Sequence, residues 1–227
     1  MNTPHAGYDR WVGGRGPRGA FLRWLFAPER VRLINTPVDH LPELLPMQPG
    51  ARVLDIGCGQ MSLLIRLAAR VPLAAGSSGI DVSTIMLRLA RRALQQRSLD
   101  RVLFVLHASG TALPFRTASF DAVLCSHLLK HLSDTDVLAL LREAYRVLRP
   151  GGRLLIWEFA PPHPALLSSY LWVARVLLRA PRIYALRDEA ALAELGRAAG
   201  FTHARRLRAG IFLFPPLPRV SLVLERA

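Results

Sequence analysis

The amino-acid sequence predicts an α/β fold in which a doubly wound parallel sheet carries helices on both faces. Two observations lead to this prediction. From residue 51 onward, short apolar runs typical of buried strands alternate with longer runs whose apolar residues recur at helical spacing. Strands that alternate with helices form parallel sheets with right-handed crossovers. The chain length, 227 residues, suits one such domain with a small appendage and is ample to bury a core.

The composition excludes several classes of protein. Apolar residues make up 51% of the chain and charged residues 20%, which is typical of a folded globule rather than a disordered or collagen-like chain. No uncharged apolar run approaches the roughly 18–20 residues that span a bilayer, and the N-terminus lacks the apolar segment of a signal peptide. Cys58 and Cys125 lie in apolar segments without a CxxC motif, so we expect a reducing, cytoplasmic compartment. We expect no metal site, because no His, Asp or Glu cluster has ligand spacing.

The first two strand–helix units begin at residue 51. Arg52–Ile56 has the pattern of a buried strand, and Ser62–Arg70 that of a helix with one apolar, leucine-rich face. A second strand ends at Gly79–Val82. Ser83 then caps a helix whose arginines lie on the outer face.

The next units follow the same alternation. Val102–Leu106 and Phe120–Cys125 are the third and fourth predicted strands. Asp134–Leu148 is a strongly periodic helix, which Pro150-Gly151-Gly152 stops because proline and glycine do not continue a helix. Arg153–Phe159 is the fifth strand.

The last part of the chain adds one helix and two strands. Asp188 caps a helix that ends at Gly200. Ala204–Arg208 and Val220–Leu224 are the sixth and seventh strand candidates.

Two segments outside this alternation are predicted lids. Residues 1–50, rich in turn-forming and aromatic residues, form a lid or cap, and residues 160–185 form a helical insertion in the main domain of residues 51–227. Ala165–Leu178 and Phe21–Phe26 combine apolar and aromatic side chains with arginines. Each therefore fits either a helix packed on the core or a helix that lies in a membrane interface.

The glycine-rich turn after the first strand predicts a ligand site. Asp55-Ile56-Gly57-Cys58-Gly59 runs from the strand toward a helix, where glycines let a ligand touch the backbone and the helix N-terminus offers free N–H groups. A nicotinamide dinucleotide fingerprint would need a third glycine, and Ser62 stands in that position. The carboxylate of Asp55 suits a cationic ligand better than a pyrophosphate. The alternative is a tight strand–helix turn that Asp55 merely caps.

A second carboxylate supports the ligand interpretation. Asp81 lies 22 residues after Gly59, at the end of the second strand. A carboxylate in that place accepts hydrogen bonds from ribose hydroxyls.

Five short motifs follow one another in order over residues 51–159. They are Val53-Leu54-Asp55-Ile56-Gly57-Cys58-Gly59, Gly79-Ile80-Asp81-Val82-Ser83, Ala112-Leu113-Pro114-Phe115, Ser119-Phe120-Asp121-Ala122-Val123-Leu124-Cys125-Ser126 and Leu148-Arg149-Pro150-Gly151-Gly152-Arg153-Leu154. Tyr8-Asp9-Arg10 and Ala199-Gly200-Phe201 extend the set. Together they resemble the motifs of class I S-adenosylmethionine-dependent methyltransferases that act on small molecules.

The resemblance implies a Rossmann-like, mostly parallel seven-stranded sheet with an antiparallel last strand, and S-adenosyl-L-methionine as the cofactor. In such a domain the backbone at Gly57 and Gly59 holds the methionine part of the cofactor, Asp81 holds the ribose and Val82 flanks the adenine. The other cofactor-binding residues that the resemblance implies are Asp55, Cys58, Ser109, Gly110, Cys125 and Ser126, the last two near the sulfonium.

Two residues depart from the family pattern. Met61 stands where the family commonly has a small residue, and we expect its side chain to crowd the cofactor. Ser109 stands where the family often has an aspartate, and its hydroxyl loses a charge-assisted hydrogen bond, a difference of about 1 kcal/mol. Both changes predict weaker cofactor binding.

Three side chains at the carboxyl ends of strands four and five are candidate catalytic groups, because ligands of open α/β sheets bind at that edge. His127 and His131 follow strand four, and each fits either a general base or a packed or capping histidine. Glu158 ends strand five and either points into the pocket or is solvated. Glu158-Phe159-Ala160-Pro161 also resembles a short region of quinone-biosynthesis C-methyltransferases.

These features predict methyl transfer to a small, hydrophobic acceptor such as a quinol, a lipid or a phenolic metabolite. An RNA methyltransferase stays open, because the net charge is +14, although only Lys130 among the 30 cations is a lysine. We do not expect nucleic acid as the partner, since Cys125-Ser126-His127-Leu128 replaces the Asn/Asp-Pro-Pro-aromatic motif of base amino-group methylation. A cofactor-binding protein or scaffold without turnover is the second alternative.

Overall fold

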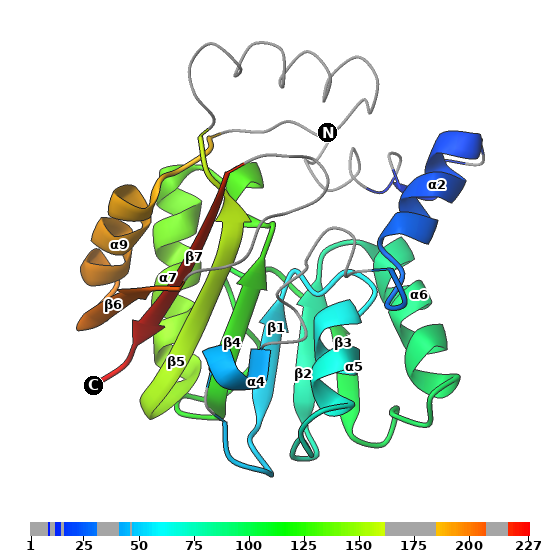
Figure 1. Cartoon of the computed structure of the whole chain (residues 1–227), viewed down its shortest axis with the longest axis horizontal. Helices are drawn as coiled ribbons and strands as arrows, with labels where there is room; N and C mark the ends of the chain where they lie inside the picture. Colours follow the sequence, from blue (N-terminus) through cyan, green and yellow to red (C-terminus); the bar gives the residue numbers. More distant parts are fainter. Residues whose placement is uncertain are drawn as a thin grey trace.

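The computed structural model describes residues 9, 12–14, 16–30, 41–45, 47–161, 185–207 and 218–227. Within these ranges, seven strands form one sheet in the order β3-β2-β1-β4-β5-β7-β6 (Figure 1). The strands are β1 (Val53–Ile56), β2 (Ser77–Asp81), β3 (Leu103–His107), β4 (Phe120–Ser126), β5 (Leu148–Phe159), β6 (His203–Arg206) and β7 (Arg219–Glu225). The first five run parallel, and β7 runs antiparallel to β5 and β6. The predicted mostly parallel sheet with an antiparallel last strand is confirmed.

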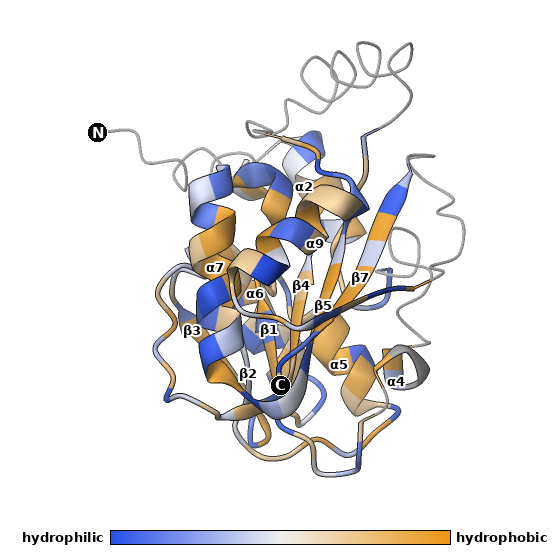
Figure 2. Cartoon of the chain, turned by 90° about the vertical axis from the view of Figure 1, so that its left-hand side faces the viewer, coloured by the Kyte–Doolittle hydropathy of each residue, from blue (hydrophilic) through white to orange (hydrophobic). Residues whose placement is uncertain are grey.

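Helices cover both faces of the sheet. The bounds are α2 (Pro17–Leu25), α4 (Leu41–Leu44), α5 (Ser62–Ala68), α6 (Thr84–Gln95), the 3-10 turn η2 (Leu129–His131), α7 (Asp134–Val147) and α9 (Glu189–Ala198). Figure 2 views the sheet close to edge-on, with α4 and α5 on one side and α7 and α9 on the other. Successive side chains of a strand point to opposite faces of the sheet, so β4 and β5 each contribute to a hydrophobic core on either face. Leu124 and Leu155 lie in the first core, and Val123 and Ile156 lie in the second.

The helix starts follow the capping chemistry of the sequence. The hydroxyl of Ser83 accepts a hydrogen bond from the Met86 N–H at 3.1 Å, and the carboxylate of Asp188 accepts one from the Ala191 N–H at 2.9 Å. Helix α7 ends at Val147 as the proline and glycines require, but β5 begins at Leu148, before them, rather than at Arg153. Strand pairing with Phe120 recruits these residues, so the predicted start of the fifth strand was wrong.

Helix α2 rests on the first strand–helix unit. The side chain of Leu22 is buried, the Gln60 amide donates to the Arg23 carbonyl at 2.9 Å, and the Ser62 hydroxyl donates to the Phe26 carbonyl at 2.8 Å. Figure 1 shows α2 at the end of the sheet toward which the parallel strands point. Most of the predicted insertion, residues 162–184 of 160–185, lies outside the described residues, as does the predicted helix over Ala165–Leu178.

Met61 does not crowd the turn in the way its size predicts. Its backbone is left-handed, with φ of 62°, and its side chain is fully buried in the core beneath the turn. Gly79 makes this possible, because a Cβ on Gly79 would lie 2.2 Å from the Met61 sulfur and 2.7 Å from the Cys58 sulfur. The Met61 side chain therefore lies in the core and not on the open surface of the turn, and its predicted effect on cofactor binding stays a prediction.

The packing at Gly79 yields a stability prediction. Gly79→Ala forces the Met61 and Cys58 side chains to shift within a close-packed core, so we expect the free energy of unfolding to fall by about 1–3 kcal/mol. Gly16→Ala is the matched control, because nothing lies within 4 Å of a Cβ at that exposed position, and its cost as a helix cap should stay below about 1 kcal/mol. Urea denaturation measures both. Equal losses for the two variants would contradict the account.

Candidate cofactor and acceptor site

The turn after β1 exposes its backbone to a ligand. Gly57 and Gly59 have φ of 76° and 52°, values that favour glycine. The N–H groups of Gly57 and Cys58 both donate to the Ile80 carbonyl at 2.9 Å, which fixes the turn against β2. Nothing lies within 4 Å of a Cβ added at Gly59, so the backbone there borders open space. A ligand can therefore approach the peptide groups at Gly59 closely, whereas a Cβ on Gly57 would lie 3.1 Å from the Leu128 side chain.

Asp81 joins the turn to the start of α6. One oxygen of its carboxylate accepts from the Gly59 N–H at 2.9 Å, and the other accepts from the Ser83 N–H at 2.8 Å. Burial raises the pKa of Asp81, and these two N–H groups oppose the rise. Each carboxylate oxygen can accept a further hydrogen bond. The predicted ribose acceptor is thus already held in place at the end of β2.

Asp55 lies beside this pair of strand ends. It is 1% exposed, and its strand position pairs with Gly79, two residues before Asp81. Burial, and next the charge of Asp81, raise the pKa of Asp55 to about 8. Asp55 is therefore largely protonated near neutrality in the free chain, and a cation placed beside it would favour its ionised form.

Two of the remaining predicted cofactor residues, Val82 and Ser109, are partly exposed. Val82 is partly exposed, and its carbonyl lies 3.0 Å from His107 Nε2. The Ser109 hydroxyl lies 2.8 Å from that of Thr111.

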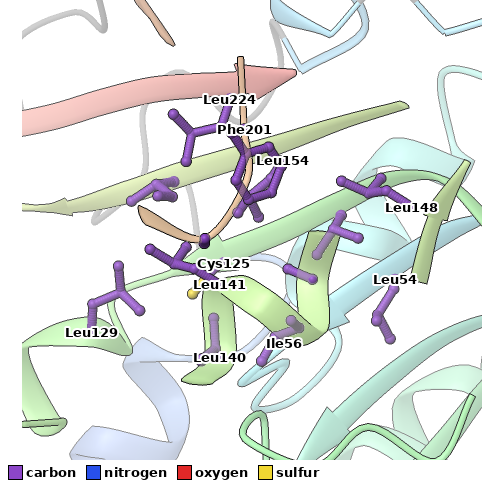
Figure 3. Packing of buried hydrophobic residues seen from close by; sticks show 14 of the residues in the cluster. Leu54, Ile56, Cys125, Leu129, Leu140, Leu141, Leu148, Leu154, Phe201 and Leu224 are labelled. Atoms are coloured by element: carbon purple, nitrogen blue, oxygen red, sulfur yellow. The ribbon is translucent and has the colours of Figure 1, made fainter. Parts of the chain in front are cut away.

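Three other predicted residues pack inward. A Cβ on Gly110 would lie 2.8 Å from both Ile56 and Leu140, so the position needs glycine for packing. Cys58 is buried in the core beneath the turn. Figure 3 shows Cys125 among buried leucines of the second core, so its thiol does not face the site.

Ser126 offers a polar group with no partner. It ends β4 next to β1, and its hydroxyl oxygen is buried without a hydrogen bond within the part of the chain that the structure describes. Buried hydroxyls are normally satisfied, so a group left over at the carboxyl edge of the sheet marks a place where a ligand atom fits.

Glu158 forms a buried charge cluster with Lys130, so the solvated alternative for Glu158 is wrong. Glu158 is 2% exposed, and its carboxylate lies 3.4 Å from Lys130 Nζ and 3.6 Å from His127 Nδ1. The backbone N–H groups of Lys130 and Phe159 donate to it at 3.2 and 2.9 Å. Burial would raise the pKa of Glu158, but the ammonium of Lys130 and the hydrogen bonds hold it well below its usual range.

Lys130 is a site residue that sequence reasoning missed. Its ammonium also donates to the His127 carbonyl and lies 5.2 Å from the centre of the Phe159 ring. The one available signal was that the chain has a single lysine, placed between two candidate histidines. Burial lowers the pKa of Lys130, and Glu158 opposes that fall.

His127 carries a neutral imidazole at this edge. Its backbone has φ of 55°, and its backbone N–H donates to the Trp157 carbonyl at 2.8 Å. The centre of its imidazole ring lies 4.7 Å from the centre of the Phe159 ring. Burial, partly opposed by Glu158, lowers the pKa of His127 to about 4. A neutral imidazole can accept a proton. His131 lies in η2 and is partly exposed, and its backbone N–H donates to the Leu128 carbonyl at 3.0 Å.

Comparison with known proteins agrees with this geometry. Residues 53–152 match a family model described as a methyltransferase domain. Together with the sheet order and the glycine turn, this match shows a methyltransferase domain with a Rossmann-like fold in this part of the chain, with S-adenosyl-L-methionine as its cofactor.

Named relatives belong to the same class. A demethylmenaquinone methyltransferase of Thermus thermophilus is 38% identical over 144 residues, 63% of this chain and 57% of the relative. A 27-O-demethylrifamycin SV methyltransferase of Amycolatopsis mediterranei is 39% identical over 133 residues, 58% of this chain and 47% of the relative. The chain thus spans about half the length of these relatives. The S-adenosylmethionine-dependent methyltransferase SibL shares the fold, with a TM-score of 0.70, 24% identity and coverage of 96% of this chain and 61% of SibL.

The residues at the glycine turn fit this cofactor. The open backbone at Gly59 leaves room for its methionine part, and Asp55 suits its cationic groups. The free acceptor capacity of Asp81 suits ribose hydroxyls. The hydroxyl of Ser126 is available at the same edge.

The single lysine allows a direct test of the buried charge cluster. Protein labelled with ¹³C only in lysine gives one side-chain signal, whose titration reports the Lys130 pKa. Glu158→Gln removes the negative charge that favours the ammonium, so we expect the pKa of Lys130 to fall by about 1 or more. Glu225→Gln, a remote carboxylate paired with Arg153, is the control and should leave the titration unchanged. An unchanged Lys130 pKa in Glu158→Gln would rule out the cluster.

Proposed function

We propose that this chain transfers the methyl group of S-adenosylmethionine to a small, hydrophobic acceptor bound over the carboxyl ends of β4 and β5. The observation that carries the proposal is the open glycine turn flanked by Asp55 and Asp81. It combines backbone access, a carboxyl group that responds to a cation, and a positioned acceptor for ribose hydroxyls. The burial of the Met61 side chain in the core supports this proposal over the alternative of a chain without turnover.

The residues of the chain hold the reactants and take up a proton. When bound, the cofactor supplies an electrophilic methyl group on its sulfonium. The transfer is an in-line displacement, so its first requirement is that acceptor, methyl carbon and sulfur lie in a row. The turn at Gly57–Gly59 and Asp81 would fix one end of this row. An acceptor hydroxyl over β4 and β5 would supply the other.

The cluster of His127, Lys130 and Glu158 suits an acceptor that loses a proton. The neutral imidazole of His127 would take the proton that an acceptor hydroxyl loses and would then pass it to water, since its pKa of about 4 already includes the support of the Glu158 carboxylate 3.6 Å away. The ion pair with Lys130 keeps Glu158 charged throughout. The names of the relatives, a demethylmenaquinone and a 27-O-demethylrifamycin SV methyltransferase, support a quinone-related acceptor, and we propose its reduced, hydroxylated form.

A labelled-methyl assay tests this function. The chain is incubated with methyl-labelled S-adenosylmethionine and, separately, with naphthoquinols, simple phenols and an oligoribonucleotide. We expect label in a ring-hydroxylated product. His127→Asn keeps a residue that tolerates the left-handed backbone and should lower kcat by about a hundredfold or more. His131→Asn is the matched control and should have a much smaller effect.

Two results would count against the proposal. Label in the oligoribonucleotide alone would establish the RNA alternative. Full kcat in His127→Asn, with a hydroxylated acceptor methylated, would remove His127 from the reaction.

A further inference from the structure

Helix α2, which is hydrogen-bonded to residues next to the glycine turn, presents two aromatic side chains to solvent. Phe21 and Trp24 are 47% and 45% exposed, and their rings stack with centres 5.8 Å apart. They are three residues apart and so share one helix face. Among the described residues, the one other large apolar side chain with comparable exposure is Phe104 on β3, at 46%.

The surroundings of this pair are basic. The guanidinium of Arg30 lies 4.4 Å from the centre of the Trp24 ring. Helix α2 itself contains Arg18 and Arg23 and has no acidic residue. Glu29, which directly precedes Arg30, is paired with Arg97. The net charge of the chain, +14, adds a field of the same sign.

Hydrogen bonds to neighbouring segments hold the helix that carries the two aromatic residues. Besides the bonds from Gln60 and Ser62, the Arg23 guanidinium donates to the Val12 carbonyl at 2.7 Å. The helix is thus anchored on the glycine turn and the start of α5, at the carboxyl edge of the sheet (Figure 1). The buried side chain of Leu22 lies between the two exposed aromatic positions of this helix.

We propose that Phe21 and Trp24, with Arg30, dock this edge of the domain on the surface of an anionic lipid bilayer. Two half-exposed rings offer far less than the roughly 800 Å² that each partner buries in a stable protein interface. Two aromatic rings beside arginines suit the boundary between headgroups and acyl chains, where anionic lipids attract the cations. In the part of the chain that the structure describes, no helix is long and apolar enough to cross a membrane.

This docking adds to the proposed function, and its benefit rests on that function because it assumes a hydrophobic acceptor. A hydrophobic acceptor partitions into the bilayer, and docking through α2 places the mouth of the site at that reservoir. The acceptor then reaches β4 and β5 without crossing water.

Vesicle co-sedimentation of the full chain tests the proposal. The probes are vesicles of phosphatidylcholine alone and of phosphatidylcholine with about 30% phosphatidylglycerol. We expect binding to the anionic vesicles that weakens with salt, and a drop in partitioning of about tenfold or more in Phe21→Ser/Trp24→Ser. Phe104→Ser is the matched control, because it removes an equally exposed ring on another edge, and it should bind like the unmodified chain.

Three outcomes would overturn the docking proposal: no binding to anionic vesicles, equal binding by the double variant, or an equal loss in Phe104→Ser. A double variant that instead abolishes self-association would assign the face to a second copy. The assay contains neither cofactor nor acceptor, so its failure leaves methyl transfer untouched. Thermal unfolding and S-adenosylhomocysteine titration of each variant confirm that the fold and cofactor site are intact.

Discussion

The site depends on the two hydrogen bonds that the carboxylate of Asp81 accepts. By accepting the N–H groups of Gly59 and Ser83, this carboxylate ties the turn after β1 to the start of α6. This bond holds the left-handed turn that leads to Met61, and the missing side chain at Gly79 gives Met61 its place in the core. The open backbone at Gly59, the buried Asp55 and the residues that anchor α2, Gln60 and Ser62, all lie next to this arrangement at the end of β2.

The elements that the sequence predicted are those set by local chemistry. Apolar periodicity located every strand of the sheet to within a few residues, except the early start of β5 at Leu148. Hydroxyl and carboxylate caps at Ser83 and Asp188 located two helix starts. The spacing between Gly59 and Asp81 placed both on neighbouring strand ends, where a hydrogen bond now joins them.

What sequence reasoning could not provide depends on contacts between distant residues. The direction of Met61 is set by Gly79 on another strand, and the burial of Lys130 is set by Glu158, 28 residues away. The face to which Cys125 points follows from its position after the shift in β4–β5 pairing between Phe120 and Ala122. The functional roles of Asp55, His127 and Ser126 are inferred from their positions and remain proposals.

The most direct test of the central claim is calorimetric titration of the chain with S-adenosylmethionine at about pH 6 and about pH 8. A cationic ligand lowers the pKa of Asp55 from its value of about 8 in the free chain. Binding should therefore release a proton near neutrality and tighten as the pH rises. Asp55→Asn should lose this pH dependence, and Asp81→Asn should lose most of the affinity. Equal affinity in Asp81→Asn and the unmodified chain, or no binding at either pH, would contradict the account.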